Sequence, residues 1–93
     1  MNKNKLRLAR NKVDQLDQKI FNLIKKRTQI VKYMLSLKKL RKEIIDYKRN
    51  NEILKKIEKK SIKNSIDPLI TRRIWQAIIW SYIDFQRRNF KKK

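Results

Sequence analysis

The sequence predicts an all-α protein of three helices, one long and two shorter, and three observations support this. Apolar residues recur at intervals of three and four from Leu6 onward, which is the spacing of one helix face. The chain has no glycine and a single proline, Pro68, placed where a helix can begin. No segment alternates apolar and polar residues as a half-buried strand does. We therefore expect no sheet.

The first expected helix is long, running from about Lys5 to Arg41. At 1.5 Å per residue it would span about 55 Å, more than the diameter of so small a domain. A lone short chain buries only a modest core, so a second copy is the simplest source of the missing apolar surface. Its apolar face consists of Leu6, Ala9, Val13, Leu16, Ile20, Leu23, Ile30, Met34 and Leu37.

Two shorter helices are expected after a break at Lys42 to Ile45. Asp46 is a candidate N-cap for the second helix, which ends near Ser61 to Asn64. Asp67 and Pro68 then supply an N-cap and a first-turn proline for a third helix that ends at about Asn89. We expect one domain over residues 1–93, with 91–93 as a frayed tail. The core candidates are Ile53, Leu54, Ile57 and Ile62 on the second helix and Ile74, Ile78, Ile79, Ile83 and Phe85 on the third.

Composition excludes several kinds of chemistry. With no cysteine and no histidine, the chain has no disulfide, no thiolate or imidazole metal site and no triad of the usual kind. No apolar run approaches the 18 or so residues of a membrane span, and no apolar block of a signal peptide stands at the start. We expect a soluble cytoplasmic protein.

The net charge of +20 invites a nucleic-acid interpretation, because clustered Lys and Arg displace counterions from phosphates. The basic residues are nevertheless spread along the whole chain. Lys, Ile and Asn fill 41 of 93 positions (19, 14 and 8), as expected from drift toward AT-rich codons. This disfavours nucleic acid as the primary partner, although the positive field would still attract a small dianion and raise its encounter rate.

Arg27 interrupts the apolar face of the first helix. A guanidinium at a core position is costly unless an anion meets it there, so the position suggests a ligand site. Snorkelling, or pairing with an internal carboxylate, is the alternative. Lys38 follows 11 residues later on nearly the same side of the helix, about 16 Å away. Arg10 is about 25 Å from Arg27 and would reach it only from the antiparallel helix of a second copy; otherwise it is a solvated surface charge.

Polar residues of the later helices form a second group. Gln86 lies on the same stripe as Trp75, Ile79 and Tyr82, and a buried amide there needs hydrogen-bond partners. A neighbouring helix or a ligand would satisfy it. Asp46, Arg49 and Asn50 cluster at the start of the second helix, where ordinary capping also explains the aspartate.

The pattern resembles the all-helical chorismate mutases over about residues 6–88. The resemblance rests on spacing rather than on single basic residues, and it implies an intertwined homodimer with two active sites. The residues that carry it are Leu8-Ala9-Arg10, Val13-Asp14, Leu16-Asp17, Leu23-Ile24, Arg27, Lys38, Asp46, Arg49, Ile78-Ile79 and Gln86.

The resemblance implies a role for each site residue in converting chorismate to prephenate. Arg27 and Arg10 of the partner subunit would bind the two carboxylates, with support from Arg49. Lys38 and Gln86 would hydrogen-bond the ether oxygen, which gathers charge as its bond breaks. Asp46 would meet the ring hydroxyl. This pericyclic reaction implies no cofactor and no metal.

Two positions depart from the mutase pattern. Asn50 stands where a Glu or Gln is usual, and Tyr82 stands where a Ser or Thr is usual. The stretch around Tyr82 and Ile83 is instead similar to the isochorismate-pyruvate lyases, which release pyruvate from isochorismate and leave salicylate. Asp46 favours the mutase, because that position is apolar in the lyase pattern. A third alternative is an inactive basic helical dimer that binds RNA or an acidic protein.

Overall fold

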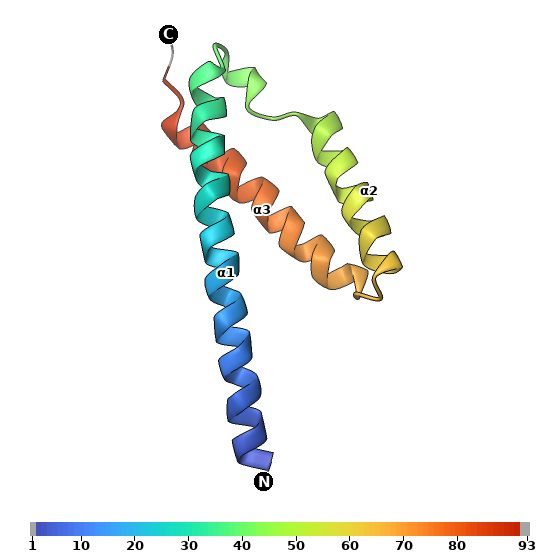
Figure 1. Ribbon diagram of the computed structural model, residues 1–93. Coiled ribbons are helices and arrows are strands. Elements are labelled where there is room, and N and C mark those ends of the chain that lie inside the picture. The colour runs from blue at the N-terminus through green and yellow to red at the C-terminus, as the bar shows by residue number, and fades with distance from the viewer. Residues whose placement is uncertain (1, 92–93) are drawn as a thin grey trace. The chain divides into compact units, whose positions relative to one another are not determined.

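The computed structural model describes residues 2–91, and these form three helices (Figure 1). They are α1 (Asn2–Leu37), α2 (Tyr47–Lys63) and α3 (Pro68–Asn89), with one 3₁₀ turn (Arg41–Glu43) between α1 and α2. The described residues contain no strand. The predicted all-α class and the order of one long and two shorter helices are confirmed.

Helix α1 ends earlier than expected, at Leu37 rather than Arg41. The Lys38 N–H bonds the Leu35 carbonyl three residues back at 3.1 Å, and Leu40 is extended at φ −121° and ψ 140°. The apolar spacing continues through Leu40, so the local pattern gives no sign of this break. The first residue after α1, Lys38, has a tertiary contact that is described below.

The contacts within the chain divide it into one unit that ends at Lys32 and a second that begins at Tyr33. The first unit is a single helix, the α1 residues up to Lys32. Its apolar side chains from Leu6 to Leu23 are more than half exposed. The stripe seen in the sequence is therefore present on the helix and available for packing.

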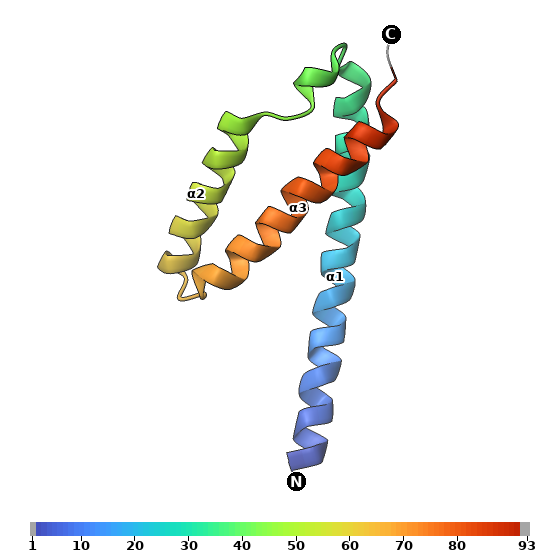
Figure 2. The same ribbon diagram turned by 180° about the vertical axis from the view of Figure 1, so that it is seen from behind.

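The second unit contains a helical hairpin. Helices α2 and α3 lie side by side, joined by a short turn, in both views (Figures 1 and 2). Each begins at the predicted N-cap: Asp46 Oδ1 accepts from Arg49 N at 3.0 Å, and Asp67 Oδ1 accepts from Leu69 N at 2.9 Å. These caps satisfy amides that no helical carbonyl can reach.

The turn between α2 and α3 closes as a Schellman motif without glycine. Ser65 N bonds the Ile62 carbonyl at 3.2 Å, and Ile66 N bonds the Ser61 carbonyl at 2.9 Å. This geometry requires a left-handed residue, and Ser65 supplies it with φ 57°. A side chain at this position strains the backbone, which glycine would not do.

The core of the second unit is small. Ile44, Ile79 and Ile83 are buried, and Leu35, Ile45, Ile53, Leu54 and Phe90 pack against them. Two expected core residues are instead exposed, Ile62 at 63% and Ile74 at 48%. Ile62 lies about 140° around α2 from Ile57, so both cannot face α3.

Ser61 takes the inward position that Ile62 was expected to fill. It is 3% exposed, and its Oγ donates to the Ile57 carbonyl at 2.7 Å. Its Oγ also lies 2.6 Å from Thr71 Oγ1 on α3. A hydroxyl pair thus joins the two helices beside the turn, which a search for apolar positions misses.

Replacing Ser65 with glycine should stabilise the fold. Glycine adopts φ 57° without strain, so we expect the free energy of unfolding to rise by about 1 kcal/mol in urea denaturation. Asn64→Gly is the matched control, because Asn64 has φ −101° and its side chain bonds the Lys60 carbonyl. That control should lower stability. A loss of stability in Ser65→Gly would contradict strain at the turn.

Candidate functional site

Lys38 and Gln86 meet in the second unit. Lys38 Nζ donates to Gln86 Oε1 at 2.7 Å, joining the segment after α1 to the last turns of α3. Gln86 is 7% exposed and Lys38 is partly buried. The expected buried amide with a polar partner is therefore present, and that partner is the lysine with which it shares a site in the family resemblance.

The Gln86 amide is held from both ends. Its Nε2 donates to the carbonyl of Tyr82, one turn earlier on α3, at 3.1 Å. A primary amide has two N–H groups and an ammonium has three. Each side chain therefore keeps at least one donor for a further hydrogen bond.

Partial burial affects the charge of Lys38. Burial lowers its pKa, because it disfavours the ammonium, while the negative charges of Glu43 and Asp46 act in the opposite direction. The unfolded chain therefore binds this proton more tightly than the folded one. Below the lowered pKa the buried ammonium costs stability, and the cost disappears as pH rises toward the unfolded-state value.

Asp46 and Arg49 meet at the start of α2, where the Arg49 backbone amide donates to the Asp46 carboxylate. Both side chains are exposed. The bond uses Asp46 Oδ1, so capping and an electrostatic effect on Lys38 come from the same carboxylate. The capping alternative considered for Asp46 is therefore correct, and capping leaves a second carboxylate oxygen for other bonds.

Asn50 lies in a groove between α2 and α3. It is partly buried and lines a hollow of about 120 Å³ whose floor includes Ile79 and Ile83. Ile83 precedes Gln86 by three residues on α3. Tyr82 is also partly buried, and its backbone carbonyl orients Gln86 as described above.

Arg10 and Arg27 belong to the first unit. Arg10 is exposed on α1, and Arg27 is partly buried on the same helix. The second unit therefore brings together Lys38 and Gln86, and separately Asp46 and Arg49. The meeting of either arginine with these residues stays a prediction.

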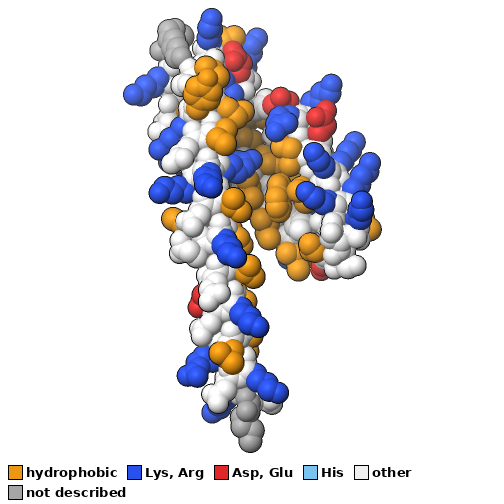
Figure 3. All heavy atoms as spheres, viewed as in Figure 1, with side chains coloured by type: hydrophobic (Ala, Val, Ile, Leu, Met, Phe, Trp, Pro, Cys, Tyr) orange, Lys and Arg blue, Asp and Glu red, His pale blue; other side chains and the backbone are white. Residues whose placement is uncertain are grey.

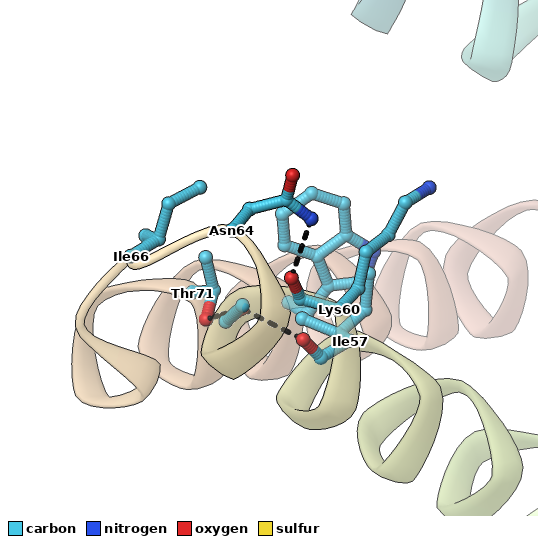
Figure 4. Close-up of a pocket in the computed structure, with 7 residues that line it drawn as sticks. Ile57, Lys60, Asn64, Ile66 and Thr71 are labelled. Atoms are coloured by element: carbon cyan, nitrogen blue, oxygen red, sulfur yellow. Dashed lines mark hydrogen bonds between the residues drawn. The ribbon is translucent and has the colours of Figure 1, made fainter.

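A larger hollow of about 400 Å³ lies at the turn between α2 and α3 (Figure 4). Ile57, Ile66 and Trp75 give it an apolar lining, and Lys60 and Asn64 contribute polar groups. The Asn64 side-chain Nδ2 donates a hydrogen bond to the Lys60 carbonyl at 2.7 Å. None of the predicted site residues lines this hollow, so size alone does not identify the functional site.

Two residues near Lys38 were missed in the sequence. Glu43 Oε1 accepts from Leu40 N at 3.2 Å, which closes the 3₁₀ turn. Glu43 stands where a capping box has its acidic residue, but Leu40 is not the Ser, Thr, Asp or Asn that would complete the signal in the sequence. Arg41 contacts the end of α3, 46 residues later, and no local pattern reports such a contact.

On the face of the described residues that Figure 3 shows, basic side chains are spread over several places rather than gathered in one patch. Figure 3 shows Lys and Arg along α1 and over α2, which agrees with the even spread in the sequence. Within residues 2–91, no cluster of three or more acidic side chains is placed to hold a metal ion. None of the helices in the described part of the chain combines the length and apolar content needed to cross a bilayer.

Comparison with known families gives a match over most of the chain. The family model for chorismate mutase type II matches residues 9–87. Comparison with curated proteins and with solved structures gave no match. The matched range includes Lys38, Gln86 and the linker between α1 and α2.

Replacing Glu43 with glutamine should lower the Lys38 pKa further. The change removes a negative charge that favours the ammonium, while the glutamine carbonyl can still accept from Leu40 N. Titration of the Lys38 side chain by NMR should therefore show loss of the proton at a lower pH. Glu58→Gln, on α2, removes an equal charge and should leave the titration unchanged. Equal shifts in both variants would show that Glu43 has no specific effect.

Proposed function

The chain belongs to the chorismate mutase type II family, and we propose that it catalyses the rearrangement of chorismate to prephenate. We place this activity in the cytoplasm, in aromatic amino-acid biosynthesis, and treat residues 1–93 as one catalytic domain. The observation that carries the proposal is the bond between Lys38 and Gln86. It brings together two side chains that each keep a hydrogen-bond donor.

The reaction suits such a pair. One carbon–oxygen bond breaks while a carbon–carbon bond forms, in a concerted step without a covalent intermediate. Negative charge grows on the ether oxygen, and donors already in place there stabilise the transition state more than the substrate. Lys38 and Gln86 are the proposed catalytic residues. The chemistry requires neither a cofactor nor a metal.

The substrate carries two carboxylates, and arginines are the proposed ligands for them. Arg27 would bind one and Arg10 of the partner subunit the other, since guanidinium groups hold carboxylates with two parallel hydrogen bonds. Arg49 would support this network from α2. Asp46, through its second oxygen, would accept from the ring hydroxyl, with Asn50 and Tyr82 beside the ring.

A homodimer is part of the proposal. The apolar stripe of α1 from Leu6 to Leu23 is more than half exposed, and a continuous stripe of this kind favours helix pairing. A second copy would cover it and would bring its own Arg10 to the site. Each of the two sites would then be incomplete in a single chain.

The second candidate is isochorismate-pyruvate lyase activity. Tyr82 and Asn50 favour it, because both depart from the mutase pattern, and both are partly buried. The same donors serve that reaction, which also breaks a carbon–oxygen bond. Asp46 favours the mutase, which we therefore place first.

Incubation with each substrate separately tests the proposal. The purified protein should convert chorismate to prephenate, identified by mass spectrometry and by loss of chorismate absorbance. Salicylate and pyruvate from isochorismate would identify the lyase instead. Conversion of neither, together with binding to RNA, would indicate a non-catalytic basic dimer.

Gln86 substitutions should act on turnover. Gln86→Ala should reduce kcat by about 10² or more with a smaller change in KM, because the bond is strongest in the transition state. Gln86→Glu should be active only in acid, where the carboxyl is protonated and can donate. Unchanged kcat in Gln86→Ala would remove the basis for the catalytic assignment.

Sedimentation equilibrium should give twice the chain mass at micromolar concentration. The expected cause is burial of the α1 stripe, so Leu16→Glu on that stripe should shift the protein toward monomer. Gln18→Glu introduces the same side chain on the other side of the same helix, about 160° around the axis from Leu16, and serves as the control. A monomeric wild-type protein would overturn both the dimer and the role of Arg10.

A further inference from the structure

The segment between α1 and α2 is tied to the end of α3 by more than the Lys38 bond. Arg41 Nη1 donates to the carbonyl oxygen of Arg87 at 3.4 Å. The guanidinium carbon of Arg41 also lies 5.4 Å from the centroid of the Phe90 ring. One side chain thus touches both the last turn of α3 and the residue that ends it.

Both contacts suit a guanidinium. Carbonyls in the last turn of a helix have no helical partner and carry partial negative charge, so a cation is favoured beside Arg87. The face of an aromatic ring also attracts a cation. Phe90 is extended at φ −67° and ψ 127°, and it packs against the core cluster of Ile44, Ile79 and Ile83.

The residues that Arg41 joins are close in sequence to the Lys38–Gln86 pair, both in the linker after α1 and on α3. Arg87 directly follows Gln86, and Arg41 follows Lys38 by three residues. The Glu43–Leu40 bond closes the turn that holds Arg41, and Ile44, 4% exposed, anchors its far end in the core. A movement of Arg41 away from α3 would therefore carry Lys38 away from Gln86.

We propose that Arg41, seated on the Arg87 carbonyl and the Phe90 ring, is a positioning residue that holds Lys38 against Gln86. It touches neither substrate nor reacting atoms. Its kinetic effect rests on the proposed function, since Lys38 and Gln86 are the proposed donors to the ether oxygen. The contact itself does not depend on that function.

The contact should matter more for rate than for stability. Arg41 is exposed and its bond to Arg87 is long, so its loss should cost little folding free energy. Misplacement of a catalytic group by about 1 Å can nevertheless cost on the order of 10²-fold in rate. Arg41→Ala should therefore lower kcat about tenfold or more, with KM within about twofold.

Three further variants sharpen the test. Arg88→Ala is the control. Arg88 directly follows Arg87 in the last turn of α3, but it pairs with Asp84 at 2.8 Å on the exposed surface. It should leave kcat unchanged. Phe90→Leu keeps an apolar contact with the core but removes the ring face, and it should lower kcat; Phe90→Tyr keeps the ring and should not.

A double variant separates positioning from a general loss of structure. If Arg41 acts through the pair, Arg41→Ala should have little further effect on kcat once Gln86 has been replaced by alanine. Equal kcat in Arg41→Ala and Arg88→Ala would overturn the proposal. So would a full, additive loss in the double variant.

A measurement without substrate distinguishes this proposal from the proposed function. The Gln86 side-chain amide gives its own NMR signals, which should shift in Arg41→Ala and stay in place in Arg88→Ala. With these shifts and no turnover of either substrate in the wild type, the contact stands and the enzymatic proposal fails. Unshifted Gln86 signals in Arg41→Ala would overturn the positioning role whatever the activity.

Discussion

The hydrogen bond between Lys38 and Gln86 lies at the centre of the candidate site. It joins residues 48 positions apart and places a charged group on a buried amide. Partial burial lowers the Lys38 pKa, because it disfavours the charged ammonium. A partly buried ammonium lowers folding stability. In the proposed function it would hold a donor in place for charge that develops during the reaction, which is how preorganised sites accelerate chemistry.

The rest of the second unit supports this bond. Ile44 packs the linker between α1 and α2 into the core, and Glu43 closes the 3₁₀ turn of that linker. The Tyr82 carbonyl accepts from the Gln86 amide and orients it. The hairpin that carries Gln86 is itself held by a strained serine turn and a buried hydroxyl pair at its other end. Membership of the chorismate mutase type II family gives this scaffold a chemical context, because that reaction needs positioned donors rather than a nucleophile.

Local signals predicted most of the fold. Asp46, Asp67 and Pro68 mark helix starts because caps and first-turn prolines act over a few residues. The predicted end of α1 at Arg41 was wrong, because the helix stops at Leu37 although the apolar spacing continues through Leu40; the residue that follows, Lys38, bonds a residue far away in the sequence. The prediction that Ile62 belongs to the core was wrong, because Ile62 follows Ile57 by five residues and therefore faces a different side of α2. The Lys38–Gln86 pair was accessible from the family pattern, whereas the contact of Arg41 with Arg87 left no trace in the sequence.

Direct observation of the Lys38 ammonium group tests the bond between Lys38 and Gln86 most directly. In protein labelled with ¹⁵N at lysine side chains, one ammonium should exchange its hydrogens slowly with water, because it is partly buried and bonded to Gln86. We expect Lys38→Met to remove this signal and Gln86→Ala to return Lys38 to the fast exchange of the exposed lysines. A slowly exchanging signal that persists unchanged in Gln86→Ala, or the absence of any slowly exchanging ammonium in the wild type, would contradict the bond between Lys38 and Gln86.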